Sequence, residues 1–119
     1  MNKTFVFLLI IILSTACNSE TIAKFEITNA SSENVDSLYI LPDKSKNNFL
    51  QMTPGSKALY EIDMTGIAKT DGYYLLSFKL KGKPVVMPFG YFSNGIPQES
   101  VTRIFIHRDT VIINPLYKN

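Results

Sequence analysis

Residues 71–92 read DGYYLLSFKLKGKPVVMPFGYF, and this stretch decides the fold. Its first half places an apolar residue at every second position, which is the period of a strand with one buried face. These positions are Tyr74, Leu76, Phe78 and Leu80. The Lys81-Gly82-Lys83 sequence is typical of a hairpin tip, and a second apolar run follows it. Because Pro88 in that run cannot donate a ladder hydrogen bond, we expect an edge strand or a bulge there.

Short apolar runs separated by turn residues continue on both sides of this hairpin. Residues 23–28 and 57–64 show the same two-residue period. Further runs occupy residues 35–41, 49–52, 101–106 and 110–114. Only residues 63–70 are compatible with a helical turn, and Gly66 argues against a long one. Seven or eight short strands of this kind predict an all-β fold, a single antiparallel β-sandwich.

The chain begins with the pattern of an export signal. Lys3 is followed by the apolar run 5–13 and by the small residues 14–16. A charged start, a short apolar segment and small residues before a cleavage site are typical of a secretory signal peptide. The run is too short to span a bilayer, so we expect cleavage and export.

Cys17 is the only cysteine and directly follows this signal. The LSTAC sequence at 13–17 resembles the lipobox of bacterial lipoproteins, which implies acyl chains on Cys17 and cleavage before it. A plain signal peptide with an incidental cysteine is the alternative. The next residues, 18–21, resemble the acidic surface-export signal of Bacteroidetes lipoproteins, which implies an outer-membrane or surface location. We therefore expect a signal peptide at 1–16, a lipid-anchored tether at 17–22 and the sandwich domain at 23–119.

The composition of the mature chain excludes several classes of function. About 100 residues suffice for one domain. The formal net charge of the whole chain is only +2 at pH 7, and no concentrated basic stretch indicates nucleic-acid binding.

The DGYYLLSF sequence at 71–78 is diffusely similar to immunoglobulin-like or transthyretin-like modules of exported proteins, a resemblance that implies no activity.

Enzymatic chemistry is not indicated. The HRD sequence at 107–109 matches a kinase catalytic loop, but the glycine-rich loop and paired lysine of a kinase do not accompany it. Glu61 and Asp63 share the outward side of one expected strand, where carboxylates are normally solvated. His107 is the only histidine, and the spacings of zinc and calcium sites are absent. We expect no catalytic residue, no metal and no cofactor.

The segment 88–95, PFGYFSNG, is the candidate contact site. Tyr91, Phe92 and Asn94 could form a platform for a glycan or peptide, or they could be core aromatics before an ordinary turn. The strand around Val86 is a candidate docking edge, because unpaired backbone groups can accept a partner's strand. The sequence therefore predicts a non-enzymatic module that binds an envelope protein; the alternative is glycan or small-ligand binding through Tyr91, Phe92 and Asn94.

Some smaller patterns leave two interpretations open. Lys79, Lys81 and Lys83 either protect a strand edge from aggregation or contact anionic head groups or polysaccharide. Ser37 and Thr110 lie in sequences that resemble Bacteroidetes O-glycosylation sites. Asn29 begins an N-glycosylation pattern, which a bacterial lipoprotein would rarely use.

Overall fold

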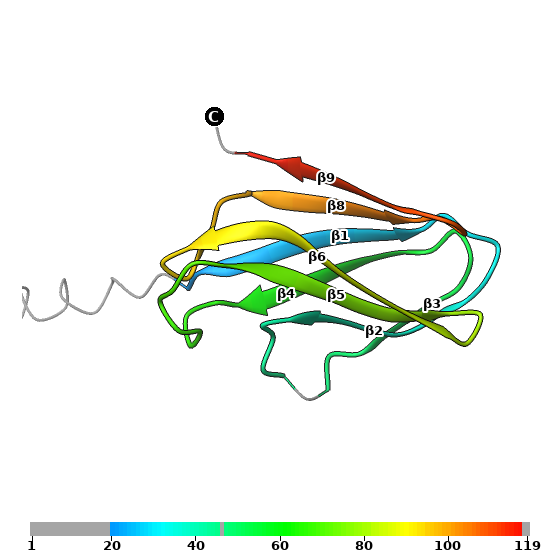
Figure 1. Cartoon of the computed structure of the whole chain (residues 1–119), viewed down its shortest axis with the longest axis horizontal. Coiled ribbons are helices and arrows are strands. Elements are labelled where there is room, and N and C mark those ends of the chain that lie inside the picture. Colours follow the sequence, from blue (N-terminus) through cyan, green and yellow to red (C-terminus); the bar gives the residue numbers. More distant parts are fainter. Residues whose placement is uncertain (1–19, 46, 118–119) are drawn as a thin grey trace, which may run out of the picture.

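The computed structural model describes residues 20–45 and 47–117, so the expected signal peptide and Cys17 lie outside the described residues. The described residues form nine strands in two sheets packed face to face (Figure 1). The strands are β1 (Ile22–Asn29), β2 (Val35–Leu41), β3 (Leu50–Met52), β4 (Lys57–Asp63), β5 (Gly72–Leu80), β6 (Lys83–Ser93), β7 (Ile96–Pro97), β8 (Val101–Ile106) and β9 (Val111–Leu116). The all-β sandwich is confirmed.

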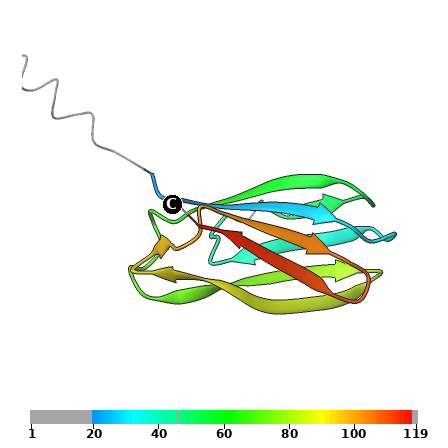
Figure 2. The same ribbon diagram turned by 90° about the horizontal axis from the view of Figure 1, so that it is seen from above.

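The two sheets have different strand orders. One sheet has the order β4-β1-β8-β9, and the other has the order β3-β2-β5-β6-β7. Figure 2 shows the two layers, with β1 and β8 side by side in one of them. All pairs are antiparallel except β1 with β8, which is parallel and corrects the expectation of a purely antiparallel sandwich. A parallel pair arises because the chain visits the other sheet between these two strands.

The core lies between the sheets and is built from the alternate residues of each strand. Phe25 is at its centre, with ring centroids 4.9 Å from Tyr74, 5.6 Å from Phe89 and 6.5 Å from Tyr60, each in an edge-on arrangement. Edge-on aromatic pairs are a favoured geometry in protein interiors. The inward faces expected for β1, β4 and β5 are confirmed, because the residues at those positions are buried or half-buried.

Two hairpin turns depend on residues with positive φ. Lys81 and Gly82 have φ of 52° and 75°, and Asn94 and Gly95 have φ of 53° and 73°. Two consecutive left-handed residues are the requirement of a type I′ turn, for which Asn-Gly is a preferred sequence. The expected tip at Lys81-Gly82-Lys83 is confirmed. Residues 64–71 form turns, and in the described ranges no helix has the length and hydropathy to cross a bilayer.

The sandwich has two ends, and we name them by the direction of β1 (Figure 1). At the amino end β1, β5 and β8 begin and β4, β6 and β9 finish; the distal end carries the turns 30–34, 53–56, 81–82 and 107–110. At the amino end β1 begins one residue earlier than expected, because the Thr21 carbonyl accepts a hydrogen bond from the Met64 amide at 2.7 Å.

The distal end is closed by a buried asparagine. Asn29 is fully buried, and its Nδ2 donates to the carbonyls of Glu33 at 2.8 Å and Met52 at 3.1 Å. Its Oδ1 accepts from the amide and the hydroxyl of Ser31, at 3.1 and 2.7 Å. One side chain therefore joins the β1–β2 loop to β3. Burial of Asn29 also leaves its amide unavailable to a glycan.

Candidate functional site

The four residues predicted to contact a ligand or partner separate into two groups. Val86 and Tyr91 lie on the outward side of the five-stranded sheet and are 59% and 46% exposed. Phe92 is only 6% exposed and packs in the core, with its ring centroid 5.4 Å from that of Tyr74. Asn94 is exposed at the β6–β7 turn, where its amide donates to Asp71 Oδ1 at 2.9 Å. Phe92 is therefore a core residue and not part of the contact surface.

A bulge in β6 explains this arrangement. Gly90 has φ of 65°, and the pairing of β5 with β6 shifts between Gly72 and Tyr74. A Cβ atom at Gly90 would lie 2.8 Å from Cδ2 of Tyr74, so only glycine fits. The Tyr91 amide donates to Oε1 of Glu99 at 3.1 Å. An extra residue in one strand reverses which side chains face inward, so Tyr91 points outward and Phe92 points inward.

Most of β6 also forms the edge of its sheet. β7 pairs only with Phe92 and Ser93, so residues 83–89 have no strand on their outer side within the described chain. Pro84 and Pro88 have no N–H, which places them where the backbone faces away from β5. Val86 lies midway between them, and its backbone has the same orientation. Of these three positions, only Val86 has an N–H that could donate to a partner's strand. Prolines at an edge hinder strand addition, so the expected docking edge is partly blocked.

The outward side chains beside this edge form an uncharged face. Cross-strand pairing aligns Leu41, Leu75 and Pro88 in one row. It aligns Tyr39, Ser77 and Val86 in the next. We call this surface, made of Leu41, Leu75, Ser77, Val86 and Pro88, the uncharged face. Leu41, Val86 and Pro88 are exposed, and no acidic or basic side chain interrupts the two rows.

The outward side of the four-stranded sheet is different in character. Its rows carry six charged side chains, Lys24, Glu26, Lys57, Glu61, Asp63 and Arg103, beside the exposed Leu59. Arg103 Nε lies 3.1 Å from Glu26 Oε2, and both side chains are about half exposed. Such exposed ion pairs stabilise a protein by little and are typical of a solvated surface. We call this surface the charged face.

A buried carboxylate next to the uncharged face was not predicted from the sequence. Asp43 Oδ2 accepts from the hydroxyl of Tyr60 at 2.7 Å and from Nδ2 of Asn48 at 2.8 Å, and Oδ1 accepts from the Ser45 amide at 2.9 Å. Burial alone would raise the pKa of Asp43, but these hydrogen bonds hold it below its usual value. The Asp-x-Ser spacing, typical of an Asx-turn, was the one local signal.

Asp43 organises the loop between β2 and β3. Its partners are neutral groups, and the loop it organises carries Phe49, whose ring stacks on that of Tyr39 with centroids 4.9 Å apart. The rings extend the apolar surface beside Val86, because Tyr39 is in the same row. This cluster therefore shapes the surface around the uncharged face.

The remaining candidates for chemistry lie apart from one another. Glu61 and Asp63 are outward on β4, and the amide of His107 donates to the Thr110 carbonyl at 2.9 Å in the β8–β9 turn. Arg108 and Asp109 form an ion pair of 3.7 Å that is largely exposed. Within residues 20–45 and 47–117 no group of three or more His, Cys, Asp and Glu side chains is placed to hold a metal ion.

The lysines and the two hydroxyls considered as modification sites are also placed. Lys79 is on β5, Lys81 is in the turn and Lys83 begins β6, so the three do not form one continuous row. Ser37 is half-buried at an irregularity of β2 with φ of 53°, and Thr110 is exposed.

No protein-family model matches the chain, and no curated protein and no solved structure matches it either.

Proposed function

We propose that this protein is a lipid-anchored protein of the bacterial cell envelope whose sandwich domain binds another envelope protein through the uncharged face. The observation that carries the proposal is the contrast between the two outward surfaces. The rows of one sheet carry charged side chains along most of their length, whereas the other sheet presents Leu41, Val86 and Pro88 in two uncharged rows that end at the charged row of Asp36 and Lys79. Contiguous exposed apolar surface is a mark of protein interaction sites.

The chemistry of the surface indicates the kind of partner. Each Å² of apolar surface removed from water contributes roughly 25 cal/mol, and an uncharged face loses no charge solvation on contact. The face is part of a sheet and is therefore broad and shallow. A partner with a broad apolar surface of its own fits it better than a partner strand, because Pro84 and Pro88 leave the β6 edge short of donors.

The anchor completes the proposal. The signal-like segment 1–16 and Cys17 support export and attachment of acyl chains, followed by a tether of a few residues. One chain binds a membrane only marginally, whereas two or more hold a protein stably. We place the domain at the outer membrane or the cell surface, with no catalytic activity and no cofactor.

A matched pair of substitutions tests the surface. Val86→Lys puts a charge on the uncharged face at an apolar side chain that is 59% exposed, and Ile112→Lys puts one on the outward side of the other sheet, where Ile112 is 49% exposed. After cross-linking in intact cells, we expect Val86→Lys to lose the partner that co-purifies with the unmodified protein. Ile112→Lys should retain it. Equal retention by both variants would contradict the proposed face, and release of Cys17→Ala from membranes tests the anchor separately.

Glycan or small-ligand binding remains the second candidate, and one observation favours it. Asp71, Tyr91 and Asn94 lie together, and the hydrogen bonds from the Asn94 amide and the Tyr91 side chain lower the pKa of the exposed Asp71 carboxyl. The ring of a tyrosine can stack on a sugar, and an ionised carboxylate beside it can accept hydrogen bonds from the hydroxyls of that sugar. Tyr91→Ala should then abolish binding to a glycan found by panel screening, and the absence of any binder from a broad panel would remove this candidate.

A further inference from the structure

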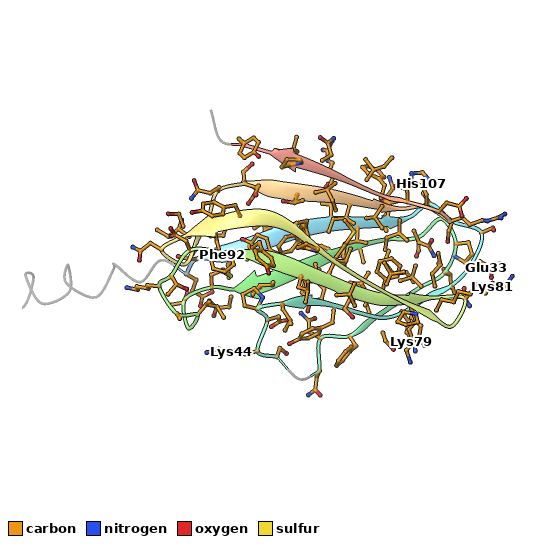
Figure 3. All side chains as sticks on the ribbon, viewed as in Figure 1. Glu33, Lys44, Lys79, Lys81, Phe92 and His107 are labelled. Carbon is orange, nitrogen blue, oxygen red and sulfur yellow. The ribbon has the colours of Figure 1, made fainter. Side chains whose placement is uncertain are left out.

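The exposed apolar side chains are distributed unevenly between the two ends of the sandwich. The amino end exposes Tyr73, Tyr91, Ile96, Leu116 and Tyr117. Tyr73 and Tyr117 are the most exposed of these, at 64% and 63%. The turns of the distal end contain only small, polar and charged residues, and the exposed apolar side chains near the distal starts of β9 and β4 are the aliphatic Ile112 and Leu59. Figure 3 shows Glu33, Lys81 and His107 together at the distal end, with Phe92 at the opposite end.

Three separate elements supply the tyrosines of the amino end. Tyr73 is the second residue of β5, Tyr91 is near the end of β6, and Tyr117 directly follows β9. β5 and β6 belong to one sheet and β9 to the other, so the tyrosines lie on both layers of the sandwich. They therefore form a rim around the end of the domain, which we call the tyrosine rim.

Covalent geometry limits how far this end can move from Cys17. Glu20, the first described residue, is three residues after Cys17. A fully extended chain spans at most about 3.6 Å per residue, so Glu20 lies within roughly 11 Å of the Cys17 Cα atom. If Cys17 carries acyl chains inserted in a bilayer, the amino end of the sandwich is held at the bilayer surface by the chain itself.

We propose that the amino end of the domain rests on the lipid bilayer, with the tyrosine rim in the headgroup region. This inference rests on the proposed lipid anchor. Tyrosine has an apolar ring and a polar tip, and it is enriched at the level of the headgroups in membrane proteins. The rim thus matches a lipid interface, whereas the distal end, with Lys81 and Arg108, matches water. The domain stands on its amino end and presents the uncharged face sideways.

The charges near the rim specify the lipid. Five acidic side chains lie at the amino end against three lysines: Glu20, Glu61, Asp63, Asp71 and Glu99 against Lys24, Lys44 and Lys69. A negative balance opposes contact with anionic lipids, because their surface potential is also negative. We therefore expect contact with zwitterionic headgroups, such as phosphatidylethanolamine, and weaker contact as the anionic fraction rises.

The chain contains no tryptophan, so a single introduced tryptophan reports the position of each end. The probe is the full-length lipidated protein in vesicles of phosphatidylethanolamine and phosphatidylcholine with brominated acyl chains. We expect the brominated lipid to quench the tryptophan fluorescence of Tyr73→Trp, and we expect its emission maximum to shift to a shorter wavelength. The matched control, Lys81→Trp at the distal turn, should show neither change. Tyr117→Trp, at a second exposed position, repeats the measurement from the other sheet.

Flotation with the vesicles is measured first, so the two ideas fail separately. A protein that does not float has no working anchor, which overturns both the proposed anchor and the inference that rests on it. A protein that floats but shows no quenching at residue 73 or 117 keeps the anchor and overturns the docking. Equal quenching at residue 81 also overturns the upright arrangement. Emission that responds only to an added co-purifying protein would assign the rim to a protein interface and overturn the lipid contact.

Discussion

The two ends of this sandwich are closed by different physical means. At the distal end Asn29 holds the β1–β2 loop and β3 together with hydrogen bonds from one buried amide. At the amino end the closure is by packing, with the ring of Phe92 lying directly on Gly72. Hydrogen bonds are directional and leave unpaired groups when they are broken, whereas packing is sensitive to volume. The ends should therefore respond to opposite kinds of substitution.

Removing the buried amide should have the largest effect. Asn29→Ala leaves the Met52 carbonyl and the Ser31 amide without this partner, while the Glu33 carbonyl keeps the Ser31 hydroxyl as a donor; each buried unpaired group costs about 1–3 kcal/mol. We expect the free energy of unfolding in urea to fall by roughly 2–4 kcal/mol. Asn34→Ala, at an exposed position of the same loop, is the control and should change it little. Similar values for the two variants would mean that Asn29 does not close the distal end.

Added volume should harm the amino end. A Cβ atom at Gly72 would lie 2.6 Å from Cζ of Phe92, so Gly72→Ala must displace the ring. Overpacking of this kind costs typically about 1–3 kcal/mol. Gly66→Ala is the matched control, because a Cβ atom there meets nothing within 4 Å. Urea unfolding of both variants measures the difference, and an unaffected Gly72→Ala would show that the end is loosely packed.

Acid should weaken the β2–β3 loop, which Asp43 organises, and spare the amide at the distal end. The pKa of Asp43 is lowered in the folded protein, whereas an unfolded aspartate titrates near about 3.9. The hydrogen-bonded carboxylate therefore contributes stability above that pH, and the contribution is lost as the pH falls through the lower folded pKa. After correction for the intrinsic exchange rate, the protection of the Ser45 amide should fall more between about pH 4.5 and 2.5 than that of the Gly55 amide, which donates to the Asn29 carbonyl. In Asp43→Asn this difference should disappear.

The smallest effect is expected for a hydroxyl in the aromatic core. Tyr74 is buried, and its hydroxyl has no hydrogen-bond partner among the described residues. Tyr74→Phe removes a polar group and keeps the ring, so the free energy of unfolding should stay unchanged or rise by up to about 1 kcal/mol. A loss of stability in thermal or urea unfolding would show that the hydroxyl is paired in solution.

The sequence predicted the parts of the fold that depend on local periodicity. The strand expected at 35–41 is β2, and the inward positions of β4 and β5 followed from alternation. Alternation counted from Phe89 would turn Tyr91 inward and Phe92 outward, and the bulge at Gly90 reverses both. A positive φ at one glycine cannot be read from the two-residue period, so the candidate contact site was the least predictable part.

Contacts between residues far apart in the sequence also could not be predicted from local sequence patterns. Asp43 is 17 residues from Tyr60, and only the packing of β4 over β2 brings the two side chains together. The parallel pairing of β1 with β8 joins residues such as Glu26 and Arg103, which are 77 positions apart. No spacing in the sequence specifies either contact.

The central position of β1 gives the domain a mechanical property. A pull on its first residues acts along the axis of a strand that is hydrogen-bonded to β4 on one side and to β8 on the other. Ladder hydrogen bonds run across the strands, so such a force loads both ladders in shear at once and cannot open them one by one. A load applied through the amino terminus is thus shared by the whole length of β1, and we expect the rest of the sandwich to stay folded until both ladders fail together.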